Sequence, residues 1–194
     1  MLTSRDISRL RPDVAANCRL WIDLCAAAGL NVLVTGTVRD DEYQQYLYAQ
    51  GRTRPGAIVT NSPVPTFHSE KFGLAFDFCQ NNKGREYSDL GFFSRAAAVA
   101  KRMGFEWGGD WTTFTDRPHL QWAGPGAAYK SADLLAGRVP PYMPLYLGGR
   151  DAYRAAIQGS AGSRTRPGSG PSSTRIGGPT TCTGNGRRAT AIDN

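Results

Sequence analysis

Two histidines and the carboxylates near them are the residues of this chain best suited to chemistry. His68 and His119 are the only histidines in 194 residues, and Asp77 and Asp116 lie close to them in the sequence. Two imidazole nitrogens and one carboxylate oxygen are a suitable set of protein ligands for catalytic zinc, with a fourth position left to water. Asp116 would remain as a spare carboxylate that can take a proton from that water. We therefore predict a hydrolytic zinc site formed by His68, Asp77 and His119, with Asp116 as general base.

Each of these residues also has a structural interpretation, which their spacing does not remove. A lone histidine is more often a structural residue than a metal ligand. A buried Asp77 needs a compensating cation, and an arginine supplies one as well as a metal does. Pro118 disfavours a helical conformation at the residue before it, so Asp116 and His119 do not share a helix face as in the His-Glu-x-x-His motif. Residue types and spacing alone leave both interpretations open.

Hydrophobic periodicity predicts the elements that must position these side chains. We expect Asp77 on an apolar strand over residues 74–78, whose alternation places it on the face opposite Phe76 and Phe78. Loop residues 51–65 lead from a helix ending at Gln50 to His68, and the aromatic stripe of that helix is expected to pack on the core. The remaining predicted strands cover 31–37, 105–107 and 119–122, and the remaining helices cover 12–28, 89–103 and 131–136.

The length and composition predict one soluble folded domain with an appended tail. Hydrophobic residues make up 40% of the chain and charged residues 20%, which are ordinary values for a globular protein. From about residue 155 onward Gly, Ser, Thr, Pro and Arg dominate and the hydrophobic periodicity disappears, which predicts disorder. We therefore divide the chain into a domain over residues 1–150 and a tail over residues 151–194.

The net charge of +7 favours an anionic partner, such as nucleic acid, a membrane surface or an acidic cell-wall polymer. Basic residues are not interleaved with aromatic ones, so we expect no nucleic-acid binding. The basic tail is either inert or a tether for polyanions such as cell-wall polymers. The sequence has no apolar run of the ~20 residues that a membrane span needs and no recognisable signal peptide, so we expect synthesis in the cytoplasm.

The four cysteines favour buried free thiols over a disulfide framework. Cys18 and Cys25 lie two turns apart on a predicted helix, a separation of roughly 10 Å, which is too far for a disulfide. Cys79 and Cys182 have no close partner in the sequence. Free thiols of this kind are typical of a reduced compartment.

Several ordered segments resemble one family, the zinc D-alanyl-D-alanine carboxypeptidase and L-alanyl-D-glutamate endopeptidase superfamily. Its signature is Ser-x-His, then Gly-x-Ala-x-Asp, then an acidic residue three positions before a second His. The similarity extends over roughly residues 5–122 and is greatest to the endopeptidase branch of phage endolysins and bacterial cell-wall hydrolases. The segments that carry it are residues 36–40, 47–56, 59–61, 73–78, 106–111 and 116–119.

The resemblance implies a role for each candidate residue. His68, Asp77 and His119 match the zinc ligands, and Asp116 matches the catalytic base. Arg39 matches the arginine that helps to bind the substrate or the polarised carbonyl oxygen, although it could instead pair with the acidic residues that follow it. The implied fold is α+β, a small antiparallel sheet with packed helices, of the hedgehog/DD-peptidase-like type, and residues 1–150 would be its zinc peptidase catalytic domain.

Two departures from the family pattern concern the first histidine. Thr66 stands where the family has Ser, which keeps a substrate-binding hydroxyl near the ligand. Eight residues separate His68 from Asp77, whereas the family has six, so we expect residues 69–71 to bulge as a loop. If the family register were kept instead, Glu70 would fall at the ligand position. We prefer His68, because a site built on Glu70 would leave that histidine unused.

The predicted function is that of a zinc-dependent peptidoglycan peptidase, an L-alanyl-D-glutamate endopeptidase that cleaves stem peptides. A D,D- or L,D-carboxypeptidase on the same scaffold and a non-catalytic cell-wall-binding module are the alternatives. The implied cofactor is Zn²⁺ and the implied partner is peptidoglycan, and we expect a monomer. Without a signal peptide, the enzyme would reach the cell wall through a partner that opens the membrane, or by an unrecognised export route.

Overall fold

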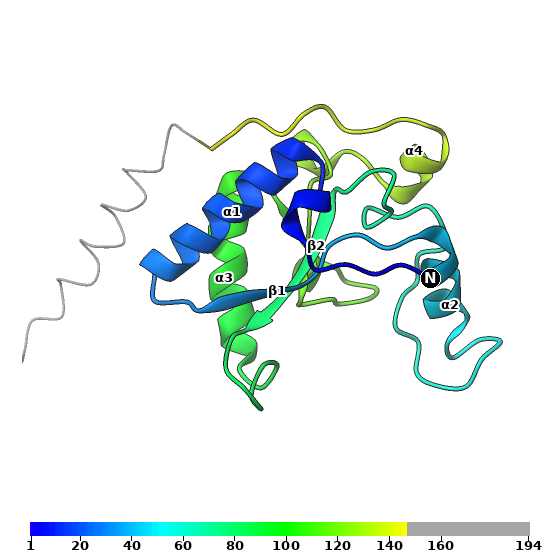
Figure 1. Cartoon of the computed structure of the whole chain (residues 1–194), viewed down its shortest axis with the longest axis horizontal. Coiled ribbons are helices and arrows are strands. Elements are labelled where there is room, and N and C mark those ends of the chain that lie inside the picture. The colour runs from blue at the N-terminus through cyan, green and yellow to red at the C-terminus, as the bar shows by residue number, and fades with distance from the viewer. Residues whose placement is uncertain (147–194) are drawn as a thin grey trace, which may run out of the picture.

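The core of the fold is a four-stranded antiparallel sheet. A computed structural model describes residues 1–146 of the chain (Figure 1). The strands are β1 (Val32–Gly36), β2 (Ala75–Gln80), β3 (Glu106–Trp107) and β4 (His119–Gln121), in the spatial order β1-β2-β4-β3. Every neighbouring pair is antiparallel. The predicted α+β class with a small antiparallel sheet is confirmed.

Two helices pack against each other beside the sheet. These are α1 (Pro12–Ala27), which follows the short 3-10 helix η1 (Ile7–Arg9), and α3 (Leu90–Met103) (Figure 1). Trp21 of α1 is fully buried, and its ring centroid lies 5.4 Å from that of Phe76 and 5.0 Å from that of Phe78. Both phenylalanines belong to β2, so the predicted alternation holds: the aromatic face of this strand meets the helices and Asp77 faces the other way.

Local signals in the sequence set the helix ends. Helix α1 begins at Pro12, whose ring favours the first helical position, and the chain turns away at Gly29 with φ +74°. Asp89 accepts a hydrogen bond from the Phe92 N–H at the start of α3, and Gly104, with φ +103°, ends that helix. The structure therefore confirms the helices predicted over 12–28 and 89–103 to within about one residue.

Helix α2 (Asp41–Ala49) does not pack its aromatic stripe on the core, so that expectation was wrong. Asp40 caps it by accepting from the Tyr43 N–H, but Tyr43 and Tyr46 are only half-buried and lie outside the hydrophobic core. Their rings stack on each other, and the Arg54 guanidinium covers Tyr46 at 4.2 Å. The reason is placement: α2 lies to one side of the sheet (Figure 1), so loop residues rather than the core cover its side chains. Its buried residue is Gln44, which donates to the Ser62 carbonyl at 2.6 Å.

The last described residues return across α1. The remaining elements are η2 (Gly108–Asp110), η3 (Pro125–Ala127) and α4 (Ser131–Leu135). After them, residues 140–146 contact side chains at the start of α1. The Arg11 guanidinium donates to the carbonyls of Pro140 and Pro141, and the Met143 N–H donates to the Asp13 carboxylate. Asn17, which is fully buried, accepts a bond from the Tyr146 N–H at 3.1 Å.

The described cysteines match the prediction of buried free thiols. Cys18, Cys25 and Cys79 are all free and buried, and burial raises the pKa of the first two thiols to about 12. Cys182 and the predicted tail over residues 151–194 lie outside the described residues, so the division at residue 150 stays a prediction. Among the helices of residues 1–146, none combines the length and the hydropathy needed to cross a membrane.

Candidate metal centre and cleft

Strand pairing brings two of the three predicted ligands together. Asp77 of β2 lies directly opposite His119 of β4 in the antiparallel register. On its other side Asp77 pairs with Gly36, where the register of β1 shifts between Val34 and Gly36. A Cβ atom added at Gly36 would lie only 3.1 Å from the Asp77 Oδ2 atom, so the absence of a side chain there makes room for the carboxylate.

His68 reaches the site from a turn that is tied to Arg39. The Arg39 N–H donates to the His68 carbonyl at 2.9 Å, and the Glu70 N–H donates to the Arg39 carbonyl at 3.0 Å. The residues after His68 form a closed turn, because the Leu74 N–H bonds back to the Phe67 carbonyl. Glu70 is exposed on this turn and pairs with Arg9. The longer spacing is therefore absorbed by the turn, and His68 rather than Glu70 faces Asp77 and His119.

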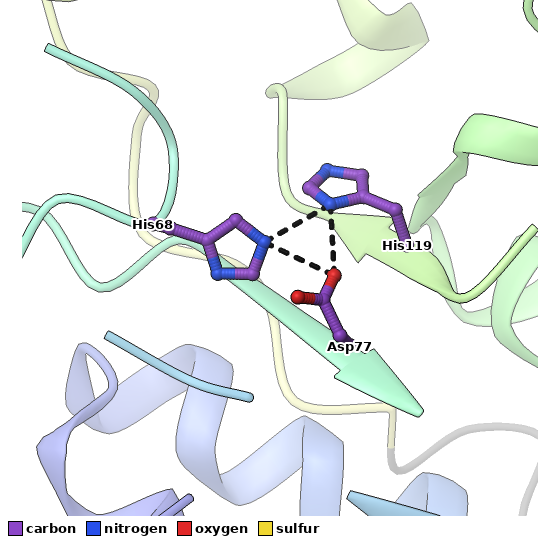
Figure 2. A group of neighbouring side chains, drawn as sticks. All are labelled: His68, Asp77 and His119. Atoms are coloured by element: carbon purple, nitrogen blue, oxygen red, sulfur yellow. Dashed lines mark hydrogen bonds and ion pairs between the residues drawn. The ribbon is translucent and has the colours of Figure 1, made fainter. Parts of the chain in front are cut away.

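The three candidate ligands converge on one point (Figure 2). The Nε2 atom of His68 lies 3.0 Å from the Nδ1 atom of His119, and each of these nitrogens lies 3.2 Å from the Asp77 Oδ1 atom. Tetrahedral zinc with ligands at ~2.0–2.2 Å implies separations of roughly 3.3–3.6 Å between ligand atoms. The triangle formed by the three atoms is thus close to the size that such an ion requires.

Outer hydrogen bonds turn an unprotonated nitrogen of each histidine toward that point. His68 Nδ1 lies 2.6 Å from the Thr37 carbonyl, which can only accept, so Nδ1 carries the proton and Nε2 keeps its lone pair. His119 Nε2 lies 2.9 Å from the Gln121 Oε1 atom, and the Gln121 NH₂ group donates to Glu106, so this oxygen accepts, Nε2 carries the proton and Nδ1 keeps its lone pair. With the Asp77 oxygen, three electron pairs face one another. This donor set fits a bound cation.

The electrostatics of the cluster agree with a carboxylate that is kept ionised. Burial alone would raise the pKa of Asp77, but the two histidines beside it hold that pKa well below its usual range. Burial lowers the pKa of His68. Burial also acts to lower the pKa of His119, yet its contacts with Asp77 outweigh this effect and raise it. The second oxygen of Asp77 lies 4.0 Å from the Arg39 guanidinium, so the ion pair of Arg39 is with Asp77.

Asp116 is held beside His119 by a close approach of the backbone. The Asp116 N–H donates to the Gly108 carbonyl at 2.9 Å, and the His119 N–H donates to the Asp116 carbonyl at 3.3 Å. A Cβ atom at Gly108 would lie 2.5 Å from the Asp116 carbonyl oxygen, so only glycine permits this approach. Burial raises the pKa of the Asp116 carboxyl, and the nearby His119 and Arg39 act against that rise.

A cleft of about 940 Å³ opens over this cluster. All six residues predicted for the site line it, which are Arg39, Thr66, His68, Asp77, Asp116 and His119. Trp111 forms part of its wall, with its ring centroid 5.1 Å from that of His119. The Thr66 hydroxyl is buried without a hydrogen-bond partner in the described part of the chain.

Three further residues of the cleft were not identified from the sequence. Gln121 and Glu106 form the hydrogen-bond chain behind His119, and Lys130 lies with its Nζ atom 3.9 Å from the Glu106 carboxylate. The position of Gln121, two residues after His119 on a predicted strand, was the available signal, because such residues share a face. Glu106 lies in one of the segments that carry the resemblance, but its contact with Gln121 depends on how two short strands pair. Lys130 precedes helix α4 and carries no comparable signal.

Comparison with known proteins identifies the family. The sequence profile of the D-alanyl-D-alanine carboxypeptidase family matches residues 61–122. The peptidoglycan L-alanyl-D-glutamate endopeptidase CwlK of Bacillus subtilis (strain 168) is 36% identical over 125 residues, which cover 59% of this chain and 74% of that protein. The chain therefore belongs to this family of peptidases, and it is a metallopeptidase. The resemblance drawn from its motifs is confirmed.

A phage protein and a solved structure are also similar to this chain. The L-alanyl-D-glutamate peptidase of Listeria phage A118 is 33% identical over 122 residues, covering 60% of this chain and 39% of that protein. The crystal structure of the L-Ala D-Glu endopeptidase ChiX of Serratia marcescens is similar with a TM-score of 0.43 and 20% identity, over 62% of this chain and 88% of that one.

Proposed function

We propose that this protein is a zinc-dependent peptidoglycan peptidase that cleaves the bond between L-alanine and D-glutamate in stem peptides. The observation that carries the proposal is the convergence of three candidate ligand atoms, 3.0–3.2 Å apart, in a cleft that also contains the spare carboxylate Asp116. Two relatives with more than 30% identity are named for this same specificity, which supports the choice of bond.

His68, Asp77 and His119 would hold the metal ion. Two imidazoles with one carboxylate suit zinc, and they leave one position of a tetrahedral site open for the reaction. When bound, Zn²⁺ supplies Lewis acidity, which lowers the pKa of water and polarises a scissile carbonyl. The protein supplies the remaining steps through side chains of the cleft.

Asp116 is the proposed general base. Its carboxylate takes a proton from the attacking water and returns that proton to the leaving amine. Because burial raises its pKa, Asp116 is a stronger base than a fully solvated aspartate. Its backbone bonds to Gly108 and His119 hold it at a fixed place in the cleft wall.

Arg39 and Thr66 are the proposed substrate-binding residues. The Arg39 guanidinium lies at the cleft with a fifth of its side chain exposed, so it can form a charge-assisted contact with a substrate carboxylate or with the developing oxyanion. The Thr66 hydroxyl has no partner within the described residues and lies in the lining of the same cleft. We propose that it bonds to the peptide backbone of the substrate.

A carboxypeptidase on the same scaffold is the second candidate, because the matching family profile is described by that activity. The two activities differ in one requirement: a carboxypeptidase needs a free C-terminal carboxylate next to the bond that it cuts. A non-catalytic wall-binding module would have no use for Asp116. Since peptidoglycan lies outside the cytoplasmic membrane, we also propose that the enzyme acts after release through an opened membrane or by export.

The deciding experiment measures bound metal together with cleavage of defined stem peptides, before and after chelation and zinc add-back. We expect one zinc per chain and cleavage between alanine and glutamate that chelation abolishes and zinc restores. An amidated C-terminus on the substrate should leave the cleavage rate unchanged, whereas a carboxypeptidase would no longer cleave such a substrate. Metal binding without any cleavage would indicate a binding module. A protein that binds no metal would overturn the proposal.

A further inference from the structure

Two side chains behind His119 form a hydrogen-bond chain to Nε2, the ring nitrogen that points away from the metal centre. We propose that Glu106 and Gln121 are positioning residues, which fix the proton of His119 on Nε2 so that Nδ1 presents a lone pair to His68 and Asp77. The inference rests on the proposed metal centre, because it explains how the ligand set is kept ready for a cation. Neither residue touches the three converging ligand atoms, so both act through His119.

The contact between Gln121 and His119 is the first link. Gln121 follows His119 by two residues on β4, so both side chains lie on the same face of the strand. Its Oε1 atom lies 2.9 Å from His119 Nε2, and only 5% of Gln121 is exposed. An amide can present either its oxygen or its NH₂ group to a neighbour, so Gln121 alone does not determine the tautomer of His119.

Glu106 removes this ambiguity. It pairs directly with Gln121 across β3 and β4, and the Gln121 Nε2 atom donates to the Glu106 Oε2 atom at 2.8 Å. An ionised carboxylate can only accept, so the NH₂ group of Gln121 must face Glu106 and its oxygen must face His119. The other oxygen of Glu106 accepts from the Trp111 indole N–H at 2.9 Å. Both carboxylate oxygens are therefore held by donors.

The same chain connects the metal centre to the wall of the cleft. Trp111 and Lys130 line the cleft, and both meet the Glu106 oxygen that does not bind Gln121. Glu106 thus ties one wall of the cleft to the ligand His119. A change at Glu106 is expected to reach His119 through Gln121, without any loss of a direct metal ligand.

Glu106→Gln is the sharpest test, because it keeps the shape of the side chain and adds a donor. The new amide can donate to Gln121 Oε1, and the Gln121 amide then turns its NH₂ group toward His119. His119 Nε2 must then accept, so the ring proton moves to Nδ1, where it blocks the lone pair. We expect metal affinity to fall about 10- to 100-fold, the usual cost of losing a partner of a metal-ligating histidine.

A double variant tests whether the order of donors and acceptors in this hydrogen-bond chain determines the tautomer of His119. In Glu106→Gln combined with Gln121→Glu, the carboxylate at position 121 can only accept, so it again faces His119 Nε2–H. The amide at position 106 can donate to that carboxylate and accept from Trp111 with its oxygen. We therefore expect the double variant to regain most of the lost metal affinity. Asp110→Asn is the matched control, since it also replaces a carboxylate with an amide, but at an exposed residue whose partner is Lys101. The metal affinity of this variant should equal that of the wild type.

Nitrogen-15 NMR of the metal-free protein provides a second readout that needs no metal. The chain has two histidines, so their ring signals are readily assigned. At a pH high enough to leave both rings neutral, wild-type His119 should carry its proton on Nε2, and Glu106→Gln should move it to Nδ1. A wild type that shows this tautomer but binds no metal would refute the metal centre and support the positioning role. Unchanged tautomer and unchanged metal affinity in a folded Glu106→Gln variant would refute the positioning role alone.

Discussion

At the scale of single residues, the candidate site contains three carboxylates whose surroundings differ and suit them to different roles. The two histidines hold the pKa of Asp77 well below its usual range and so keep its carboxylate ionised, which suits a metal ligand. Asp116 is made more basic by burial, which suits a group that takes up and releases a proton. Glu106 accepts bonds from Trp111 and Gln121 and so sets the orientation of its neighbours.

The role of Asp116 leads to a direct prediction. Asp116→Asn keeps the size of the side chain but removes the base, so kcat for stem-peptide cleavage should fall by about 10²–10⁴-fold. The bound zinc per chain should stay the same, because Asp116 is not one of the converging ligands. Steady-state kinetics with metal analysis on the same samples measure both effects. Glu70→Gln, an exposed carboxylate outside the cleft lining, serves as control, and an Asp116→Asn variant that cleaves at the wild-type rate would exclude this residue as the base.

Most of the candidate site could be predicted from sequence, and the missing part has a physical reason. His68, Asp77, Asp116 and His119 sit in short motifs whose order and residue types carry the family resemblance, and the structure brings them to one cleft. Glu106 belongs to a motif too, but its bond to Gln121 depends on the pairing of a two-residue strand with a three-residue strand. Strands this short leave almost no periodicity to detect, so side-chain contacts between them stay invisible in the sequence.

At the scale of elements, the bounds of α1 and α3 were predictable and the placement of α2 was not. Periodicity identifies an apolar or aromatic face but does not say what covers it. For α1 and α3 the cover is the sheet, whereas for α2 it is a stacked tyrosine pair and an arginine from the following loop. The packing of residues 140–146 on α1 was equally hidden, because it depends on side chains that bind backbone groups about 130 residues away.

Asp13 is the central residue of that packing and gives a pH-dependent prediction. Burial acts to raise its pKa, but the Arg11 guanidinium and the Met143 N–H outweigh burial and lower it. A group whose pKa is lower in the folded state stabilises that state above its unfolded pKa, here 3.8, and loses this contribution as the pH falls through the folded value. Asp13→Asn should therefore reduce the free energy of unfolding by about 1.5–3 kcal/mol at neutral pH, and the deficit should shrink under acid conditions.

Chemical denaturation of the metal-free protein across pH measures this deficit without the added effect of metal release. Hydrogen exchange should also become faster at the amides of residues 140–146 in the variant, since the Met143 N–H loses its charged acceptor. Asp23→Asn, on the exposed side of the same helix, is the matched control and should change the stability by less than about 0.5 kcal/mol. A deficit of the same size at all pH values would show that packing rather than charge holds the segment.

At the scale of the whole molecule, the helices and the cleft lie on opposite faces of strand β2. Helices α1 and α3 bury the aromatic face of β2, and the opposite face of the same strand carries Asp77 into the cleft. A single strand thus contributes side chains both to the hydrophobic core and to the candidate metal centre. The alternation that was visible in the sequence of β2 predicted this division, because one face is continuously apolar and the other contains the aspartate.

The net charge of the whole chain suggests how the enzyme approaches its substrate. Residues 155–194 carry five arginines against Asp193, which leaves a net charge of +4 in this segment out of +7 for the chain. We predict that replacing these arginines with glutamine weakens retention on intact, anionic cell-wall sacculi and flattens its dependence on salt, because fewer charges attract the polymer. Cleavage of a short soluble stem peptide should not change, since its chemistry lies in the cleft. The substituted residues are Arg164, Arg166, Arg175, Arg187 and Arg188.

A second variant separates the effect of charges in residues 155–194 from the effect of the total net charge on wall retention. Five exposed basic residues of the folded part, none of which lines the cleft, can be changed to glutamine in the same way; these are Arg5, Arg19, Lys71, Lys83 and Arg85. Both variants have a net charge of +2 in place of +7, so equal losses of wall retention would mean that total charge matters and the tail has no special role. A larger loss in the tail variant, with peptide cleavage intact in both, would identify residues 155–194 as a wall-binding tether. Full retention in both variants at every salt concentration would show that attraction to the wall does not depend on this charge, and the cleft itself would then account for substrate capture.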